Sequence, residues 1–384
     1  MAGPIQHSAM RASNLALVLR TVAESGGAPR SRITASTGLT KSSVAGLVAD
    51  LTTWGLVRET LGPPTRERGR PSTVVALEPA GAAGLGLEAN VDYLAALVTD
   101  LAGTVRYRHV VSRDNRDRSP SEVFTDLADL GAAAKSAADE QGLALAGTCV
   151  AVPGTVEDGR VLRAPNLGWT DLAVDVPLPP TPWRPVVENE ANLAALAELW
   201  YGEVPHDFVH VSGEIGIGGG IVVDGELFRG SHGRAGELGH VVLDPDGPPC
   251  SCGGRGCLER LAGQDAILAA AGARDRADLE ARCADGDARA LAAVEQAGRH
   301  LGTALASVTN LLDPESVVLG GAFAYLAPWL RDTVEETLDR HGVHPEVRVS
   351  HLGTEAAVRG AAGSVVRRVV TDPAGFLTLR DGAA

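Results

Sequence analysis

Residues 235–259 read AGELGHVVLDPDGPPCSCGGRGCLE and bring one histidine, three cysteines and two glutamates into a single short segment. The candidate metal ligands in this segment are His240, Cys250, Cys252 and Cys257. One imidazole and three thiolates complete the tetrahedral shell that Zn²⁺ prefers, and four protein ligands leave no open coordination position. The spacing therefore predicts a structural zinc ion rather than a hydrolytic centre. The alternative is a disulfide pair with spare thiols, which the lack of secretory features in the sequence disfavours.

Two glutamates, Glu237 and Glu259, flank the candidate metal ligands. A loop folded around an ion would hold both carboxylates and the His240 imidazole near one another. Carboxylates accept paired hydrogen bonds from adjacent hydroxyls, and a metal-bound histidine keeps its second ring nitrogen oriented as a donor. This chemistry suits a polyol such as a sugar, although either glutamate taken alone would be interpreted as a solvated loop acid.

Three segments resemble the ROK family of sugar kinases and sugar-responsive repressors: AGELGH at 235–240, CSCGGRGCLE at 250–259 and IGIGGG at 215–220. The resemblance extends from about Gly84 to the C-terminal helix. It implies an α/β fold of the actin-like ATPase (ribonuclease H-like) type, with two lobes around a sugar cleft. The lobes implied are a first lobe at 84–186 with a return helix at 355–372, and a second lobe at 187–354 that carries the zinc-binding loop.

Composition and charge indicate a soluble body with a basic module attached. The chain has 384 residues, is 45% hydrophobic, and contains no apolar run near membrane-spanning length. Residues 1–11 lack the apolar core of a signal peptide, so we expect a cytoplasmic protein without a membrane partner. Nine bases and four acids give residues 1–76 a charge of +5, whereas the remainder carries −19 within the total of −14. This asymmetry indicates a basic binding module on an acidic body.

The basic module has the pattern of a winged helix-turn-helix domain, which we place at 1–78. Helical apolar spacing at 14–22, a short helix at 31–37 and a third helix capped by Thr40 or Ser42 form the expected motif. An arginine-bearing loop at 62–71 forms the expected wing. The residues expected to contact the DNA grooves are Thr40, Lys41, Ser42 and Ser43 at the start of the third helix, and Arg66, Arg68 and Arg70 in the wing. The alternative, a helical bundle for protein contact, does not account for the basic wing.

The resemblance also assigns the sugar side of the cleft. In the family segment matched by 150–155, Gly154 would let the backbone approach the sugar, and in that matched by 164–169, Asn166 would bond a hydroxyl. Asn189 and Glu190 stand where the kinases carry an Asn-Asp pair. One extra methylene moves the Glu190 carboxylate by about 1.5 Å from the position of the catalytic base, so we expect binding rather than catalysis and assign no catalytic residue. The expected sugar-binding residues are Gly154, Asn166, Asn189, Glu190, Glu237, His240 and Glu259.

The nucleotide side departs from the kinase pattern at both phosphate turns. Residues 88–92 read EANVD where the kinases have Asp-x-Gly-Gly-Thr, so both glycines are gone and Asp92 adds negative charge. In the second turn Ile215 replaces the family's phosphate-contacting threonine, and Glu214 adds another charge. We therefore expect weak or absent ATP binding.

Three functions compete for this combination of features. The favoured one is a sugar-responsive transcriptional regulator, usually a repressor. It would bind an inverted-repeat operator in double-stranded DNA as a homodimer or tetramer, and a sugar or sugar derivative would switch it. The second is an active ATP-dependent sugar kinase with an added DNA-binding domain, and the altered phosphate turns argue against it. The third is a DNA-binding scaffold whose cleft takes no ligand.

Overall fold

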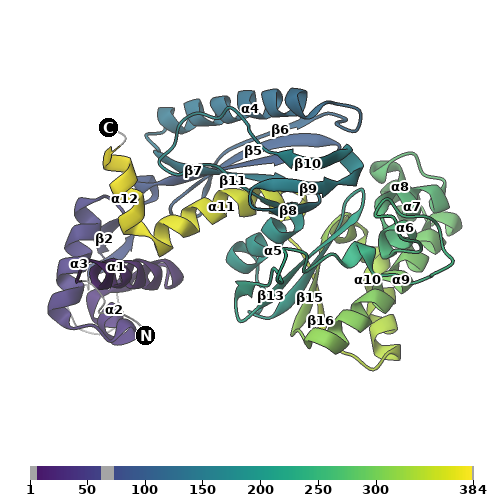
Figure 1. Cartoon of the computed structure of the whole chain (residues 1–384). Coiled ribbons are helices and arrows are strands. Elements are labelled where there is room, and N and C mark those ends of the chain that lie inside the picture. The colour runs from purple at the N-terminus through teal and green to yellow at the C-terminus, as the bar shows by residue number, and fades with distance from the viewer. Residues whose placement is uncertain (1–6, 62–72, 383–384) are drawn as a thin grey trace.

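The computed structural model of the chain describes residues 7–61 and 73–382, which form a small N-terminal domain followed by two α/β lobes (Figure 1). The elements of the N-terminal domain are α1 (His7–Glu24), β1 (Ala28–Pro29), α2 (Arg30–Thr37), α3 (Lys41–Thr53), β2 (Val57–Leu61) and β3 (Thr73–Leu77). Its three strands form one sheet in the order β1-β3-β2. Helix α1 starts earlier than the expected 14–22, because the preceding alanine, methionine and arginine are good helix formers.

Helix α3 begins as its sequence predicts. The Thr40 hydroxyl caps it by accepting a hydrogen bond from the Ser43 amide at 3.1 Å, and Thr40 and the next three residues are exposed. The apolar side chains that bury the opposite side of the helix are Val44, Leu47, Val48 and Leu51. Strands β2 and β3 pair in register from Val57 with Leu77 to Leu61 with Thr73 and form the base of the wing. The wing tip, with Arg66, Arg68 and Arg70, lies outside the described residues.

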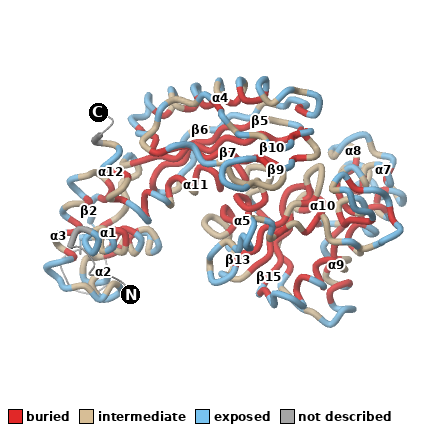
Figure 2. Tube along the Cα trace, viewed as in Figure 1, coloured by how far each residue is buried: buried red, intermediate tan, exposed pale blue. Residues whose placement is uncertain are grey.

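The first lobe is built on a five-stranded sheet in the order β11-β7-β4-β5-β6. Its elements are β4 (Ala83–Ala89), β5 (Tyr93–Asp100), β6 (Val105–Ser112), α4 (Pro120–Glu140), β7 (Leu145–Val152) and β11 (Val186–Asn189), with η1 (Pro79–Gly81) before them. A smaller sheet projects from this lobe and consists of β8 (Thr155–Glu157), β9 (Arg160–Ala164) and β10 (Trp169–Ala173), with η2 (Pro165–Leu167) between the last two. Helix α4 covers one face of the large sheet, and Figure 2 shows that its outer side is exposed, while β4 and β5 beneath it are buried and the edge strand β6 is largely exposed.

The second lobe holds another five-stranded sheet, in the order β14-β13-β12-β15-β16. Its strands are β12 (Phe208–Gly213), β13 (Ile217–Val223), β14 (Glu226–Leu227), β15 (Ser316–Gly321) and β16 (Glu346–Val349). Its helices are η3 (Leu238–His240), α6 (Leu258–Ala262), α7 (Gln264–Ala271), α8 (Arg276–Ala284), α9 (Ala288–Leu312) and α10 (Ala322–Arg340). Helix α5 (Glu190–Tyr201) joins the lobes, because it packs on β12 and β13 of this sheet and on the return helix α11 of the first lobe.

The return helix α11 (Ala356–Thr371), which follows η4 (Gly353–Glu355), lies on the face of the first sheet opposite α4 (Figure 1). Glycines let it approach its neighbours at backbone distance. A Cβ on Gly84 or Gly86 of β4 would overlap carbonyl oxygens of α11, and a Cβ on Gly360 of α11 would overlap the Leu193 carbonyl oxygen of α5. The helix is therefore held between a strand and a helix with no room for side chains at these contacts.

The N-terminal domain shares a hydrophobic core with the first lobe instead of hanging from a linker. One continuous cluster includes Leu15 and Leu19 of α1, Trp183 of the first lobe and Val369 of α11. Phe376 of the last helix, α12 (Pro373–Gly382), joins this cluster, and its ring centroid lies 5.6 Å from that of Trp183. The N-terminal domain is thus packed on the end of α11 that lies far from the cavity between the lobes.

Within the described residues, none of the helices combines the length and the apolarity that a bilayer crossing requires.

The close packing of α11 predicts that Gly360→Ala is destabilising, although alanine ordinarily favours a helix. The new methyl group would press on the α5 backbone, and such overpacking costs about 1–3 kcal/mol. Gly46→Ala is the matched control, since Gly46 lies in α3 and a Cβ added there would meet no described atom within 4 Å, and it should raise stability by up to about 1 kcal/mol. Urea unfolding followed by circular dichroism measures both changes; equal effects of the two substitutions would contradict this account of the packing.

Candidate functional site

A cavity lies between the two lobes, at the carboxyl ends of parallel strands from both sheets. Its walls include the ends of β4, β7 and β11 in the first lobe and of β12 and β15 in the second. This is the usual position of a ligand site in open α/β sheets. All seven residues expected on the sugar side line this cavity: Gly154, Asn166, Asn189, Glu190, Glu237, His240 and Glu259.

The polar groups on the sugar side converge on the turn at Gly216. A Cβ placed there would lie 2.8 Å from Glu259 Oε2 and 3.5 Å from Asn166 Nδ2. Asn166 comes from η2 of the first lobe, whereas Glu259 comes from α6 of the second. A ligand bound between them would therefore touch both lobes.

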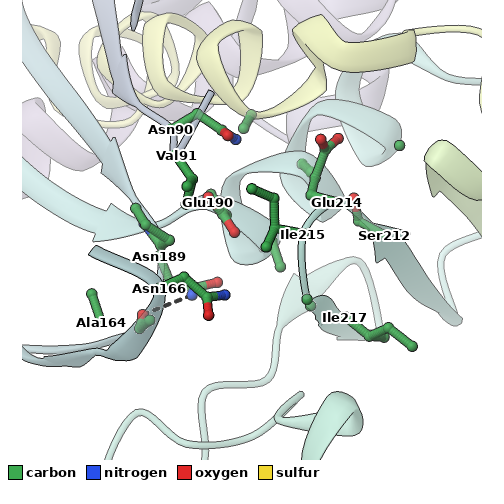
Figure 3. Close-up of a pocket in the computed structure, with 18 of the residues that line it drawn as sticks. Asn90, Val91, Ala164, Asn166, Asn189, Glu190, Ser212, Glu214, Ile215 and Ile217 are labelled. Carbon is green, nitrogen blue, oxygen red and sulfur yellow. Dashed lines mark hydrogen bonds between the residues drawn. The ribbon is translucent and has the colours of Figure 1, made fainter. Parts of the chain in front are cut away.

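Asn189 is oriented by its own hydrogen bonds. Its amide nitrogen donates to the Gly154 carbonyl at 2.8 Å, and its amide oxygen caps α5 by accepting from the Asn192 amide at 3.0 Å. Figure 3 shows its side chain near Asn166 and Glu190 at the cavity wall. One N–H and one lone pair of the Asn189 amide remain for a ligand.

The four candidate metal ligands form one cluster beside the cavity. The donor atoms of His240, Cys250, Cys252 and Cys257 all lie within 4.8 Å of one another, and all three thiols are free. Two separations define the cluster: Cys252 Sγ is 3.7 Å from Cys257 Sγ, and Cys250 Sγ is 3.7 Å from His240 Nδ1. The other ring nitrogen, Nε2, lies 3.7 Å from Glu237 Oε2. The histidine thus faces the thiols with one nitrogen and the sugar-side acid with the other.

Two contacts across the cleft hold the cysteine-bearing loop against the first lobe. Arg163 of β9 donates to the Cys252 carbonyl at 2.9 Å and also to the Ser251 carbonyl. Thr155 Oγ1 of β8 donates to Glu237 Oε1 at 3.2 Å. These contacts of Arg163 and Thr155 hold the small sheet of the first lobe against the second lobe, beside the sugar side of the cavity. We call the two contacts the clasp.

The nucleotide side of the cavity holds three carboxyl groups, from the buried Glu88 and the half-buried Glu190 and Glu214. Burial raises the pKa of Glu88 to about 7 and the pKa of Glu214 to about 8. Burial also raises the pKa of Glu190 well above its usual value, and the charges of the other two add to that shift. Figure 3 shows Glu190 between the sugar-side amides and Glu214, so this side chain belongs to both halves of the cavity.

Several polar atoms in this half have no hydrogen-bond partner among the described residues. They are Oε2 of Glu88, Oε2 of Glu190 and both ring nitrogens of His210. Glu88 Oε1 accepts a hydrogen bond from the Tyr93 hydroxyl at 2.7 Å. His210 is fully buried and lines the same cavity, and burial lowers its pKa to about 4, so the imidazole is neutral. Buried acceptors without donors are costly and are concentrated at ligand sites.

Sequence reasoning missed three of these features. Glu88 was recognised only as part of an altered turn, and His210 lies in a strand that reads as plain apolar core. Arg163 carries no motif of its own. A buried polar residue inside an apolar strand, such as His210 in VHVSG, was the one available signal.

Two α/β lobes around a cavity, preceded by three helices and a β-hairpin, form the arrangement expected of an actin-like sugar-kinase body fused to a helix-turn-helix module. Residues 84–368 match the ROK family, and residues 12–60 match the IclR helix-turn-helix domain. The chain therefore belongs to the ROK family.

Individual relatives include both repressors and kinases. The xylose repressor of Bacillus subtilis (strain 168) is 28% identical over 369 residues, which cover 92% of this chain and 94% of that protein. The glucokinase of Halalkalibacterium halodurans is 30% identical over 281 residues, covering 64% of this chain and 84% of that enzyme. A crystal structure of a ROK family transcriptional regulator, a homolog of the E. coli MLC protein, has a TM-score of 0.78 at 26% identity and covers 97% of this chain and 100% of its own. The similarity to regulators thus spans the N-terminal domain as well as both lobes.

The clasp predicts that Arg163→Ala loosens the cysteine-bearing loop. Amide hydrogen exchange across residues 250–257 should speed up by about threefold or more, because each hydrogen bond contributes on the order of 1 kcal/mol. Arg160→Ala is the control, since Arg160 lies on the same strand but pairs with Asp171 inside the small sheet. Unchanged protection of the loop in Arg163→Ala would show that these contacts do not hold it.

Proposed function

We propose that this protein is a sugar-responsive, DNA-binding transcriptional repressor whose cleft binds sugar without phosphorylating it. The observation that carries the proposal is one cavity with two unlike halves, attached to a winged helix-turn-helix domain. One half presents polar groups suited to hydroxyls, and the other presents carboxyl groups where a kinase would hold phosphates.

The sugar half supports binding of a polyol. We assign Glu237 and Glu259 as acceptors for paired hydroxyls, His240 Nε2 as a donor, and Asn166 and Asn189 as groups that bond further hydroxyls. Gly154 has φ near +89°, and a side chain there would collide with the backbone of β9, so glycine keeps this wall open.

The other half opposes ATP binding. An incoming triphosphate would meet the buried Glu88 and the half-buried Glu190 and Glu214, with Asp92 at the rim. Ionised carboxylates repel phosphate, and neutral ones supply none of the positive charge that phosphate sites use. Efficient phosphotransfer is therefore not part of the proposal.

We assign the His–Cys cluster to a structural zinc ion. With Zn–S bonds of about 2.3 Å, a tetrahedral site has sulfur–sulfur edges of about 3.8 Å, and the Cys252–Cys257 separation is 3.7 Å. Four protein ligands would fill the shell, so the ion would act by fixing the loop and orienting His240 Nε2 toward the sugar. The Cys250 thiol, which donates to Glu259 at 2.9 Å, would lose its proton when metal binds and release that carboxylate for ligand.

We assign operator contacts to the exposed start of α3, namely Thr40, Lys41, Ser42 and Ser43, and to the wing arginines Arg66, Arg68 and Arg70, which lie outside the described residues. The Thr40 hydroxyl also caps α3, so it serves the fold as well as the interface. A homodimer or tetramer would place two such helices on an inverted-repeat operator. The proposal includes a cytoplasmic location, where the operator DNA is found.

The proposed switch needs only that sugar bind two lobe arrangements with different affinity. A coupling of about 1–3 kcal/mol would change operator affinity by roughly 5 to 150-fold. Helix α11 connects the two events, because Ala356 and Ala357 line the cavity while the other end of the helix packs on α1.

A second candidate function, an active sugar kinase, is favoured by the 30% identity to a glucokinase. The carboxyl groups of the nucleotide half argue against it, as does the absence of a cationic residue from the described cavity lining.

The proposed function predicts sugar-dependent operator binding without ATP dependence. Full-length protein would first be used to select its operator from random DNA, and binding would then be measured by fluorescence anisotropy with and without a panel of monosaccharides. One sugar class should change operator affinity by at least fivefold, whereas ATP-Mg should neither change it nor raise the melting temperature. ATP-dependent phosphorylation of any hexose that Glu190→Gln abolishes would establish the kinase instead.

The zinc assignment predicts about one zinc per chain by elemental analysis. Cys252→Ala should lose that zinc and weaken sugar binding, because the loop no longer holds His240 and Glu259 in place. Cys283→Ala, at a buried cysteine in α8 outside the cluster, should keep both properties. A protein without stoichiometric metal that still binds sugar would refute the assignment.

A further inference from the structure

The nucleotide half of the cavity is rich in carboxyl groups. Its three carboxyl groups interact electrostatically, since the charge of Glu88 raises the pKa of both Glu190 and Glu214. Their neighbours are Tyr93, which donates to Glu88, and Arg276, whose charge partly offsets that of Glu214. Asp92 adds a further negative charge at the rim, where Arg116 pairs with it at 2.9 Å. The nearby cations thus lie at the edges, and no cation is among the described lining residues.

His210 provides an independent observation in the same half of the cavity. The imidazole is fully buried, lines the cavity, and has no partner for either ring nitrogen among the described residues. A neutral imidazole offers one nitrogen acceptor. Together with the Oε2 atoms of Glu88 and Glu190, the His210 ring makes three buried polar groups that have an atom without a hydrogen-bond partner among the described residues.

A bare divalent ion fits this half poorly. Among the described residues, the His–Cys cluster is the one group whose donor atoms converge closely enough for a single metal ion. The carboxyl groups of the nucleotide half do not meet that condition. A protonated amine requires fewer converging ligands than a metal ion, because it can bond to one or two of these acceptors and leave its remaining N–H donors for other partners.

We propose that this half is a subsite for a protonated amine, so that the effector is an unphosphorylated monosaccharide carrying a free amino group. The inference rests on the proposed function, which places the sugar ring against the other half. Glu190 belongs to both halves, so a substituent of a sugar bound beside Asn166 and Asn189 reaches the acidic half at this residue. An ammonium group carries a positive charge that favours the ionised form of nearby carboxyl groups, and each of its N–H donors can bond to an acceptor separately.

The same chemistry predicts weaker binding of sugars in which the amine is acetylated, a phosphate is added, or a hydroxyl stands in place of the amine. Acetylation of the amine removes its charge and most of its donors, and a phosphate brings negative charge to a wall of carboxyl groups. A hydroxyl group donates one hydrogen bond and carries no charge, so it can bond to only one of the unpartnered polar groups in this half of the cavity.

The experiment compares matched ligands on the full-length, zinc-loaded protein by isothermal titration calorimetry near neutral pH. The ligand pairs are D-glucose with D-glucosamine, D-galactose with D-galactosamine, D-mannose with D-mannosamine and D-xylose with D-xylosamine, together with the N-acetylated and 6-phosphorylated hexosamines. In the stereochemical series that binds, the free amine should bind about tenfold or more tightly than the parent sugar, as expected of charge-assisted hydrogen bonds. The acetylated and phosphorylated forms should bind more weakly than the amine.

The variants place this preference at the proposed subsite. Glu214→Gln should reduce the ratio of amine to parent affinity to within about threefold, and Glu88→Gln should do the same. Asp114→Asn is the control, because Asp114 is exposed, pairs with the same Arg116 and lies outside the lining residues, and it should keep the ratio.

The outcomes separate this inference from the function on which it rests. A parent sugar that binds as tightly as its amine, and that alters operator binding, would leave the repressor intact and overturn the amine subsite. No binding by any sugar would overturn both. An amine preference in the unmodified protein that survives both Glu→Gln substitutions would also overturn the assignment of the subsite to these residues.

Discussion

The backbone-to-backbone packing of α11 is the constraint on which the rest of the structure depends. Glycines in β4 and in α11 itself remove the side chains that would separate this helix from the first sheet and from α5. Contacts of this kind are stiff, because closely packed atoms have discrete arrangements and little compressibility. The first residues of α11 form part of the cavity wall, and its last residues join the core of the DNA-binding domain. Helix α11 therefore contacts both the ligand cavity and the DNA-binding domain.

Because α11 is rigid, a small rotation at the cleft produces a larger displacement at the end of the helix that carries the DNA-binding domain. A helix of 16 residues is about 24 Å long, and a rotation of about 5° would shift its far end by about 2 Å. That displacement is larger than the tolerance of a hydrogen bond to a base edge. Because Leu15, Trp183 and Phe376 lie in one core, the N-terminal domain would follow the first lobe rather than absorb the movement in a linker. The lobe carrying the clasp and the domain reading the operator thus form a single mechanical unit.

The sequence predicted those parts of the molecule whose chemistry is local. The cysteine motif lies within a short loop, so spacing alone indicated that His240, Cys250, Cys252 and Cys257 could meet, and the structure brings them together. The apolar stripe and the cap of α3 were readable for the same reason. The carboxyl cluster was not, because Glu88, Glu190 and Glu214 come from β4, the start of α5 and the turn after β12, and only the topology brings them together. The role of Arg163 could not be predicted, because its partners are backbone carbonyl groups, which every residue type carries.

The two halves of the cavity explain how a kinase-type body can serve as a receptor. Asn90 and Val91 stand where the kinases' first phosphate turn has its glycines, and Glu88, Glu190 and Glu214 line the same half of the cavity, so under the proposed function nucleotide binding is opposed by charge rather than merely lost. Buried acceptors without partners carry a free-energy cost that the fold must offset elsewhere, and such cost is maintained at sites that act on a ligand. The acceptors at Glu88 and Glu190 flank the joint between the lobes, whereas Glu214, His210 and Glu259 belong to the second lobe. A ligand whose donors satisfy both sets at once is bound more strongly when the lobes are close together, and this difference in affinity is what a conformational switch requires.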